Sequence, residues 1–149
     1  MAPSSTSSFA SHPQAVLHDY SLQKPAEFWA QYARMIDWDT PYSAPLTRNP
    51  DGSHTWFKDG RLNTCFNAID RHVKNGRGGQ VALYYDSPLN KGEKRQITYQ
   101  QLLEEVQTFA GVLADHGVAK GDVVLIYMPM VPEALISMLA CARLGVTHS

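Results

Sequence analysis

The sequence has few cysteines, no long apolar run and no excess of either charge. Its two cysteines, Cys65 and Cys141, lie far apart and outside any Cys-x-x-Cys spacing. This argues against a disulfide framework or a zinc knuckle and predicts two buried thiols in a reducing compartment. Lys and Arg total 13 against 14 Asp and Glu, a formal net charge of −1. The chain therefore has no basic surplus for a nucleic-acid backbone, and no run approaches the roughly 18 apolar residues of a membrane span.

The composition is that of a globular protein. The 149 residues are 44% hydrophobic and 18% charged, enough for one domain and too few for a large multidomain enzyme. Residues 1–21 are predicted to form a disordered tail. Met1–His18 contains no Lys, Arg, Asp or Glu, so it fits neither a secretory signal nor an arginine-rich transit peptide.

The first half of the chain predicts one helix and a long ordered loop. Apolar residues recur at helical spacing from Pro25 to Ile36, with proline at a first-turn position. The segment Asp37–Arg61 is rich in Pro, Asn, Gly and Asp and is predicted to be a loop with a turn at Asn49–Gly52. We expect Trp56 and Phe57 to anchor this loop.

A short helix and a hairpin are predicted next. Asn63 is placed to cap a helix that ends at Gly76, with Cys65, Phe66, Ile69 and Val73 facing inward. Val81–Tyr85 and Arg95–Thr98 have the pattern of two hairpin strands.

The last third predicts a strand, a crossover helix and the start of another strand. Thr98 and Gln101 form a capping-box pattern for a helix that ends at Gly117. Val123–Met128 is an unbroken apolar run, typical of a parallel strand covered on both faces. Pro132–Leu144 is an almost wholly apolar helix, which implies burial on more than one side. With Val146–Ser149 these segments predict a right-handed βαβ unit from the front of a larger α/β protein.

Candidate chemical residues are few. Asp70, Arg71 and His72 are neighbours on a helix, where adjacent side chains diverge by about 100°, so we expect them to pack and not to catalyse. Gly76–Gly79 precedes a strand and does not open a helix, so a tight turn is favoured over an anion site. Metal-ligand spacing is absent among the histidines, which are His12, His18, His54, His72, His116 and His148.

The most site-like segment is Tyr127–Glu133. It follows the carboxyl end of the predicted strand and leads into a helix N-terminus, where open α/β sheets bind ligands. Its two prolines also suit a purely structural corner, and we favour that interpretation. No Gly-x-x-x-x-Gly-Lys-Ser/Thr loop or Gly-x-Ser-x-Gly elbow occurs.

Several segments in fixed order resemble the front of a short-chain acyl-CoA synthetase, an AMP-forming adenylating enzyme. The resemblance covers roughly residues 22–149, through Trp56–Asn63, Asn67–His72, Ile97–Tyr99, Gly121–Asp122, Tyr127–Glu133, Met138–Arg143, Gly145 and His148–Ser149. Within the family, Asn63–Asn67, Gly76–Leu83 and Asp86–Pro88 are most similar to the propionyl-CoA synthetase branch, with acetate preference as the rival.

The resemblance implies an α/β fold: the N-terminal part of the adenylate-forming fold, with an incomplete mixed sheet and flanking helices. It implies an N-terminal extension at residues 22–79 and the start of the AMP-binding domain at residues 80–149. The family activates a short-chain carboxylate, propionate or acetate, with ATP and Mg²⁺ and transfers it to CoA. The family's phosphate loop, ribose-binding Asp, Arg and catalytic Lys have no match here, so we assign no catalytic, cofactor-binding or metal residues.

Three further expectations follow from this resemblance. The 149-residue chain alone should lack ligase activity and bind none of these cofactors. Cytoplasm is the expected location, with the mitochondrial matrix as the alternative. A different class of function is also open, in which the short chain is a non-catalytic interaction module that exposes Val123–Met128 and Val131–Leu144 to a partner.

Overall fold

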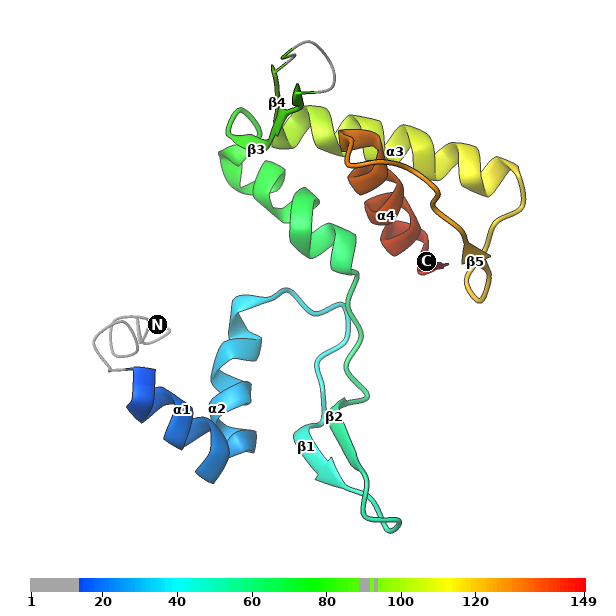
Figure 1. Ribbon diagram of the computed structural model, residues 1–149. Helices are drawn as coiled ribbons and strands as arrows, with labels where there is room; N and C mark the ends of the chain where they lie inside the picture. The colour runs from blue at the N-terminus through cyan, green and yellow to red at the C-terminus, as the bar shows by residue number, and fades with distance from the viewer. Residues whose placement is uncertain (1–13, 89–91, 93) are drawn as a thin grey trace. The chain divides into compact units, whose positions relative to one another are not determined.

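The computed structural model describes residues 14–88, 92 and 94–149, which fall into two compact units (Figure 1). The first unit ends at Leu62 and the second begins at Asn63. In the part of the chain so described, no helix has the length and apolar character needed to cross a membrane.

The first unit begins with two helices, α1 (Gln14–Gln23) and α2 (Pro25–Tyr32), followed by a 3-10 turn, η1 (Ala33–Met35). The predicted disordered tail is therefore wrong over residues 14–21, and its first 13 residues lie outside the described part. A tertiary contact accounts for the difference, because the ring of Tyr20 packs edge to face on Phe28 with centroids 5.7 Å apart. Of the apolar stripe expected from Pro25 to Ile36, Phe28 is buried, whereas Trp29 and Met35 are exposed.

A β-hairpin lies within the segment predicted to be a loop. Its strands, β1 (Ala44–Arg48) and β2 (His54–Lys58), pair antiparallel with Leu46 opposite Trp56. The predicted turn at Asn49–Gly52 is confirmed, because the Gly52 N–H donates to the Asn49 carbonyl at 3.0 Å and Gly52 has a φ of +86°. The loop prediction is wrong for the two strands, which are short and lack a clear two-residue apolar alternation.

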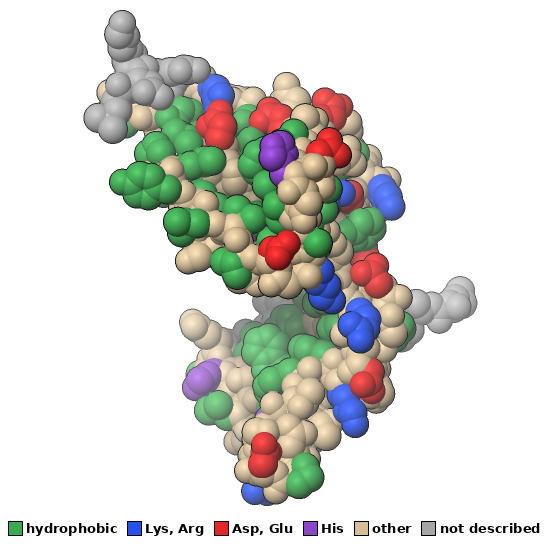
Figure 2. Space-filling model, turned by 90° about the vertical axis from the view of Figure 1, so that its right-hand side faces the viewer, with side chains coloured by type: hydrophobic (Ala, Val, Ile, Leu, Met, Phe, Trp, Pro, Cys, Tyr) green, Lys and Arg blue, Asp and Glu red, His purple; other side chains and the backbone are tan. Residues whose placement is uncertain are grey.

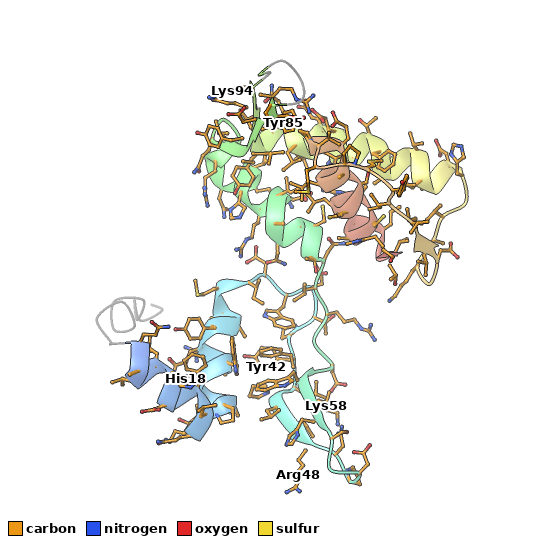
Figure 3. All side chains as sticks on the ribbon, viewed as in Figure 1. His18, Tyr42, Arg48, Lys58, Tyr85 and Lys94 are labelled. Carbon is orange, nitrogen blue, oxygen red and sulfur yellow. The ribbon has the colours of Figure 1, made fainter. Side chains whose placement is uncertain are left out.

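Aromatic packing that includes Tyr42 (Figure 3) holds this hairpin. The Phe57 ring lies 5.4 Å from that of Trp38 and 5.1 Å from that of Tyr42, centroid to centroid. Trp56 packs edge to face on Trp29 at 6.4 Å. The expected anchoring role of Trp56 and Phe57 is confirmed.

The second unit opens with the expected helix, over residues 64–77. It contains two π-helical stretches, η2 (Phe66–Asp70) and η3 (Val73–Arg77). The Asn63 cap is confirmed, because its Oδ1 accepts from the Phe66 N–H at 3.0 Å. Gly76 leaves the helical conformation with a φ of +79°, so the chain turns where the sequence predicts.

The predicted hairpin and long helix are also confirmed. Strands β3 (Val81–Asp86) and β4 (Lys94–Thr98) pair antiparallel, and α3 (Tyr99–Asp115) follows directly. Thr98 and Gln101 form both hydrogen bonds of the capping box, at 3.2 and 2.9 Å. Gly117, with a φ of +82°, then follows the helix as expected.

The chain ends in a parallel pair of short strands connected by a helix. They are β5 (Val123–Val124), α4 (Pro132–Leu144) and β6 (Thr147–His148). The β-α-β order is as predicted, but regular strand stops at Val124 and Leu125–Met130 is irregular. The expected burial of this run is wrong in this chain, because Val123, Leu125 and Tyr127 are 66%, 78% and 98% exposed. Among the described strands only β6 pairs with β5, so the other edge of β5 has no strand beside it.

The core of the second unit lies where the helix at 64–77, α3 and α4 meet. Its largest members are Ile69 and Val106, both fully buried, together with Leu102 and Ile136. Helix α4 is covered on one side, through Ile136, Ala140 and Cys141, and exposed on another. The α/β fold class is confirmed, with antiparallel and parallel pairing in separate two-stranded sheets among the described residues.

We expect Ile69→Ala to lower the free energy of unfolding by about 2–5 kcal/mol, because it opens a cavity at a fully buried position. The exposed Val112→Ala is the matched control and should stay within about 0.5 kcal/mol. Urea denaturation followed by circular dichroism measures both, and equal midpoints for the two variants would show that this core does not carry the stability.

Candidate functional site

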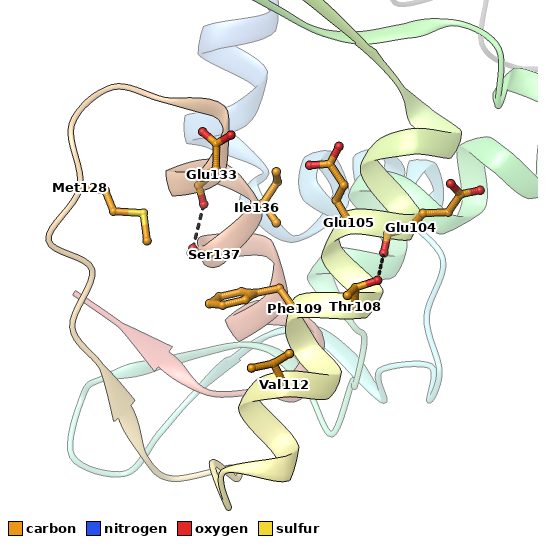
Figure 4. A pocket seen from close by; sticks show the side chains of 9 residues that line it. All are labelled: Glu104, Glu105, Thr108, Phe109, Val112, Met128, Glu133, Ile136 and Ser137. Atoms are coloured by element: carbon orange, nitrogen blue, oxygen red, sulfur yellow. Dashed lines mark hydrogen bonds between the residues drawn. The ribbon is translucent and has the colours of Figure 1, made fainter.

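Two residues of the segment Tyr127–Glu133, Met128 and Glu133, line a cavity of about 440 Å³ in the second unit. The other lining residues lie on α3 and α4 (Figure 4). Met128 reaches in from the irregular segment, opposite Phe109 on α3. Pro132 occupies the first turn of α4 and fixes the direction in which the segment enters that helix.

The cavity has apolar side chains and carboxylates but no cation. Phe109, Val112, Met128 and Ile136 supply the apolar lining. The carboxylates come from Glu104 and Glu105 on α3 and from Glu133 on α4, whose charge is offset by Arg95 at 3.0 Å, so the lining is acidic. Such a lining repels an anionic ligand such as a polyphosphate.

The two hydroxyls of the cavity are already used inside their own helices. Thr108 Oγ1 donates to the Glu104 carbonyl at 2.9 Å, and Ser137 Oγ donates to the Glu133 carbonyl at 2.8 Å. Neither lies beside a histidine, as an activated nucleophile would require. Neither hydroxyl of the lining is therefore arranged as an activated nucleophile.

The carboxyl group of Glu133 is held in its ionised form by its surroundings. Its own backbone N–H, at the start of α4, and the Arg95 guanidinium at 3.0 Å both lower the pKa of its carboxyl group. Because the pair is largely exposed, its contribution to stability is small. That contribution is present above the ordinary pKa of a glutamate and is lost as the pH falls through the lowered one.

Asp70 and His72, which the sequence predicts to have a packing role, contact different partners. Asp70 Oδ2 lies 2.6 Å from Arg143 Nη2 at the end of α4, in a pair only 13% and 23% exposed. The His72 ring packs near Tyr99, with centroids 5.0 Å apart, and its Nδ1 lies 3.1 Å from Arg77 Nη1.

Sequence reasoning missed the ion pair between Asp70 and Arg143 because 73 positions separate them. Asn63 joins the same cluster by donating from Nδ2 to the Arg143 carbonyl at 2.9 Å. Cys65 lies fully buried beside it, and burial raises the pKa of its thiol, an effect that Arg143 partly offsets. Burial also raises the pKa of the Cys141 thiol, and both cysteines are free, as predicted.

Gly76–Gly79 leads into a tight turn, as favoured from the sequence. The Gly78 carbonyl accepts from the Gln100 N–H at 3.0 Å, and the Gln80 carbonyl accepts from the Tyr99 N–H at 3.0 Å. The carbonyl groups of this turn thus accept hydrogen bonds from the first N–H groups of α3. An anion-binding loop would instead present N–H groups.

No metal centre is found among the residues that the structure describes. Groups of three or more His, Cys, Asp or Glu side chains with metal-binding geometry are absent there. Of the six histidines considered from the sequence, His12 lies outside the described residues.

Comparison with known proteins decides the family. The model of AMP-binding enzymes matches residues 69–149, and the model of the acetyl-coenzyme A synthetase N-terminus matches residues 14–68. The chain belongs to the AMP-binding enzyme family. The predicted resemblance to AMP-forming short-chain acyl-CoA synthetases is confirmed, and the chain corresponds to their N-terminal region.

Named relatives support the same family. The bovine (Bos taurus) mitochondrial acyl-CoA synthetase short-chain family member 3 is 50% identical over 129 residues, which cover 87% of this chain and 19% of that protein. The acetyl-coenzyme A synthetase of Drosophila melanogaster is 45% identical over 137 residues, covering 87% of this chain and 20% of that one. The chain thus spans about a fifth of the length of these relatives.

A solved structure extends the family match to the fold. Acetoacetyl-CoA synthetase from Streptomyces lividans superposes with a TM-score of 0.80 at 27% identity, over 94% of this chain and 21% of that chain. The resemblance therefore includes nearly all of this chain.

We expect Asp70→Asn to lower the free energy of unfolding by about 1.5–3 kcal/mol, since it removes a charged hydrogen bond from a largely buried pair. Asp86→Asn is the matched control, because Asp86 pairs with Lys94 at 2.9 Å on the exposed surface and should cost no more than about 1 kcal/mol. Chemical denaturation of both variants checks this, and an equal loss in the two would contradict a special role for the buried pair.

Arg95→Gln is expected to raise the pKa of the Glu133 carboxyl toward its ordinary value, because the guanidinium that favours the ionised form is removed. Side-chain ¹³C NMR titration measures the shift. Lys94→Gln serves as the control, since Lys94 pairs with Asp86 and should leave the Glu133 titration unchanged. If Arg95→Gln left the pKa of Glu133 unchanged, the lowering of that pKa would come from the helix N-terminus alone.

Proposed function

We propose that this chain is the N-terminal part of an ATP-dependent, AMP-forming fatty acid–CoA ligase that acts on propionate. The observation that carries the proposal is the order of the two family matches, residues 14–68 and then 69–149, which together include every described element. In the proposed reaction, the carboxylate attacks the α-phosphate of ATP to release pyrophosphate. The thiol of CoA then displaces AMP from the acyl-adenylate.

The lining of the cavity does not fit a triphosphate. It contains three carboxylates, from Glu104, Glu105 and Glu133, and no Lys or Arg, whereas a triphosphate needs cations or N–H donors. No metal-binding group of side chains occurs in the described part of the chain. We therefore assign no step of the reaction to these residues, and we propose that residues 1–149 alone bind neither ATP nor Mg²⁺ and have no activity.

The domain assignment belongs to the same proposal. We assign residues 22–79 to the N-terminal extension and residues 80–149 to the start of the AMP-binding domain. The match to the first family model ends at residue 68 and the match to the second begins at residue 69. The first compact unit ends at residue 62 and the second begins at residue 63. The helix at 64–77 crosses the boundary between the family models and packs in the core with α3, so it links the two regions.

Two details of the proposal, the substrate and the location, each have one alternative. Propionate is favoured by the segments Asn63–Asn67, Gly76–Leu83 and Asp86–Pro88, and acetate is the rival substrate, since the fly relative is an acetyl-coenzyme A synthetase. For location, the bovine relative is named mitochondrial, which supports the mitochondrial matrix over the cytoplasm.

A second candidate function is a non-catalytic interaction module. The exposed apolar side chains of Val123, Leu125 and Tyr127 favour it, because soluble monomers seldom expose such a row. Transcript sequencing past the codon for Ser149 discriminates the two: an in-frame continuation supports the ligase, and a stop codon in most transcripts supports the module.

Pyrophosphate release tests the ligase proposal. We expect residues 1–149 to give no propionate-dependent release above a blank. A chimera in which residues 14–149 replace the matched region of the Drosophila synthetase should release pyrophosphate with carboxylate, ATP and CoA. Turnover by the short chain, or a folded chimera without activity, would contradict the proposal. Comparing propionate with acetate on the longest product of the gene decides the substrate.

A further inference from the structure

The cavity of about 440 Å³ between α3 and α4 is an open groove on the second unit (Figure 4). Its floor includes Ile136 and Ser137, which are only 6% and 4% exposed. Its rim includes Val112 and Met128, which are 45% and 47% exposed. A buried floor below an exposed rim leaves room for a second molecule to lie in the cavity. We refer to it as the α3–α4 groove.

The α3–α4 groove has two chemically different ends. On α3 its lining extends from Glu104 to Val112, which at 1.5 Å per residue is roughly 12 Å, or about two helical turns. In Figure 4 the three glutamates gather toward one end, and Phe109 and Val112 lie toward the other. A ligand that fits the groove therefore has an apolar part and, about one to two turns away, a positive charge.

The chain offers little positive charge of its own to the acidic end. Helix α3 contains acidic residues but no Lys or Arg. Arg95 pairs with Glu133, whereas within the described part of the chain no cation forms an ion pair with Glu104 or Glu105. On the face of the second unit shown in Figure 2, hydrophobic and acidic side chains lie beside one another. Two carboxylates of the groove thus remain for a cationic partner.

We infer that the α3–α4 groove binds a basic amphipathic helix of a second protein. Helices that dock in grooves insert apolar side chains that repeat once per turn, and the apolar end between Phe109, Val112 and Met128 fits such side chains. The flexible thioether of Met128 adapts to side chains of different shape. A Lys or Arg of the same helix then meets Glu104 and Glu105. This inference does not depend on the proposed ligase activity.

The exposed rim favours a helix over other kinds of ligand. Sites for small molecules bury about 70–90% of the ligand surface, whereas a docked helix covers a groove with one side only. Val112 and Met128 stand at the surface and enclose nothing by themselves. An anionic lipid surface is repelled by the same carboxylates that attract a basic helix.

Fluorescence anisotropy of a labelled model peptide tests the inference. The probe is a helical peptide of about 15 residues made only of leucine and lysine, with the lysines on one face. The control probe has glutamate in place of lysine. Binding is measured to residues 1–149 and to the chimera with the Drosophila synthetase described above. Both proteins should bind the lysine probe, more weakly as salt is added, and neither should bind the glutamate probe.

Two pairs of variants locate the binding site. Val112→Lys places a cation in the groove and should weaken binding of the lysine probe by at least about 10-fold, whereas Val16→Lys on α1 should change it by less than about 2-fold. Glu105→Gln should weaken it by about 2- to 5-fold, the effect of one exposed ion pair. Asp115→Asn removes the same charge at the end of α3, outside the groove, and should have no such effect. All four positions are exposed, so the variants keep the fold.

Several results would overturn the inference. One is absence of binding, or equal loss of binding in Val112→Lys and Val16→Lys. Another is binding by residues 1–149 but not by the chimera, which would show that the remainder of the synthetase fills the groove. A third is self-association of residues 1–149 that Val112→Lys abolishes, which would make the occupant a second copy of this chain. A chimera that binds the probe but releases no pyrophosphate would support the inference and contradict the proposed function.

Discussion

The second unit depends on the burial of three helices against one another. The helix at 64–77, α3 and α4 meet around Ile69, Val106 and Ala140, all almost fully buried. This packing supplies the apolar burial that the small two-stranded sheets cannot provide on their own. The antiparallel hairpin and the parallel pair are both positioned by the ends of these helices.

The charged cluster at the end of α4 complements this apolar packing. Asp70 bonds the Arg143 guanidinium, and Asn63 bonds the Arg143 carbonyl while capping the helix at 64–77. One asparagine thus satisfies the start of one helix and the end of another. Because the family models change over at residues 68 and 69, the contact between Asn63 and Arg143 joins the two regions that they describe.

The cavity beside Tyr127–Glu133 illustrates why position in a fold does not define a function. It lies after β5 and at the start of α4, where α/β sheets bind ligands. Yet its charges are carboxylates and its hydroxyls are bonded within their own helices. The family assignment, and not this cavity, therefore carries the proposed function.

Sequence patterns predicted the structure correctly where the interaction that fixes it is local. The Asn63 cap, the capping box of Thr98 and Gln101, and the turn at Gly52 all involve residues within a few positions of one another, and all are present. They failed for α1 and for the hairpin of β1 and β2, where contacts such as Tyr20 with Phe28 and Trp56 with Trp29 select the conformation.

The sequence by itself determined the family and the helices at 64–77, α3 and α4, because motif order and helical periodicity are properties of the chain read residue by residue. Tertiary structure alone decided that Asp70 pairs with Arg143 and that Val123, Leu125 and Tyr127 are exposed. The apolar composition of a run predicts that it is buried, but its exposure depends on which other segments are present to cover it.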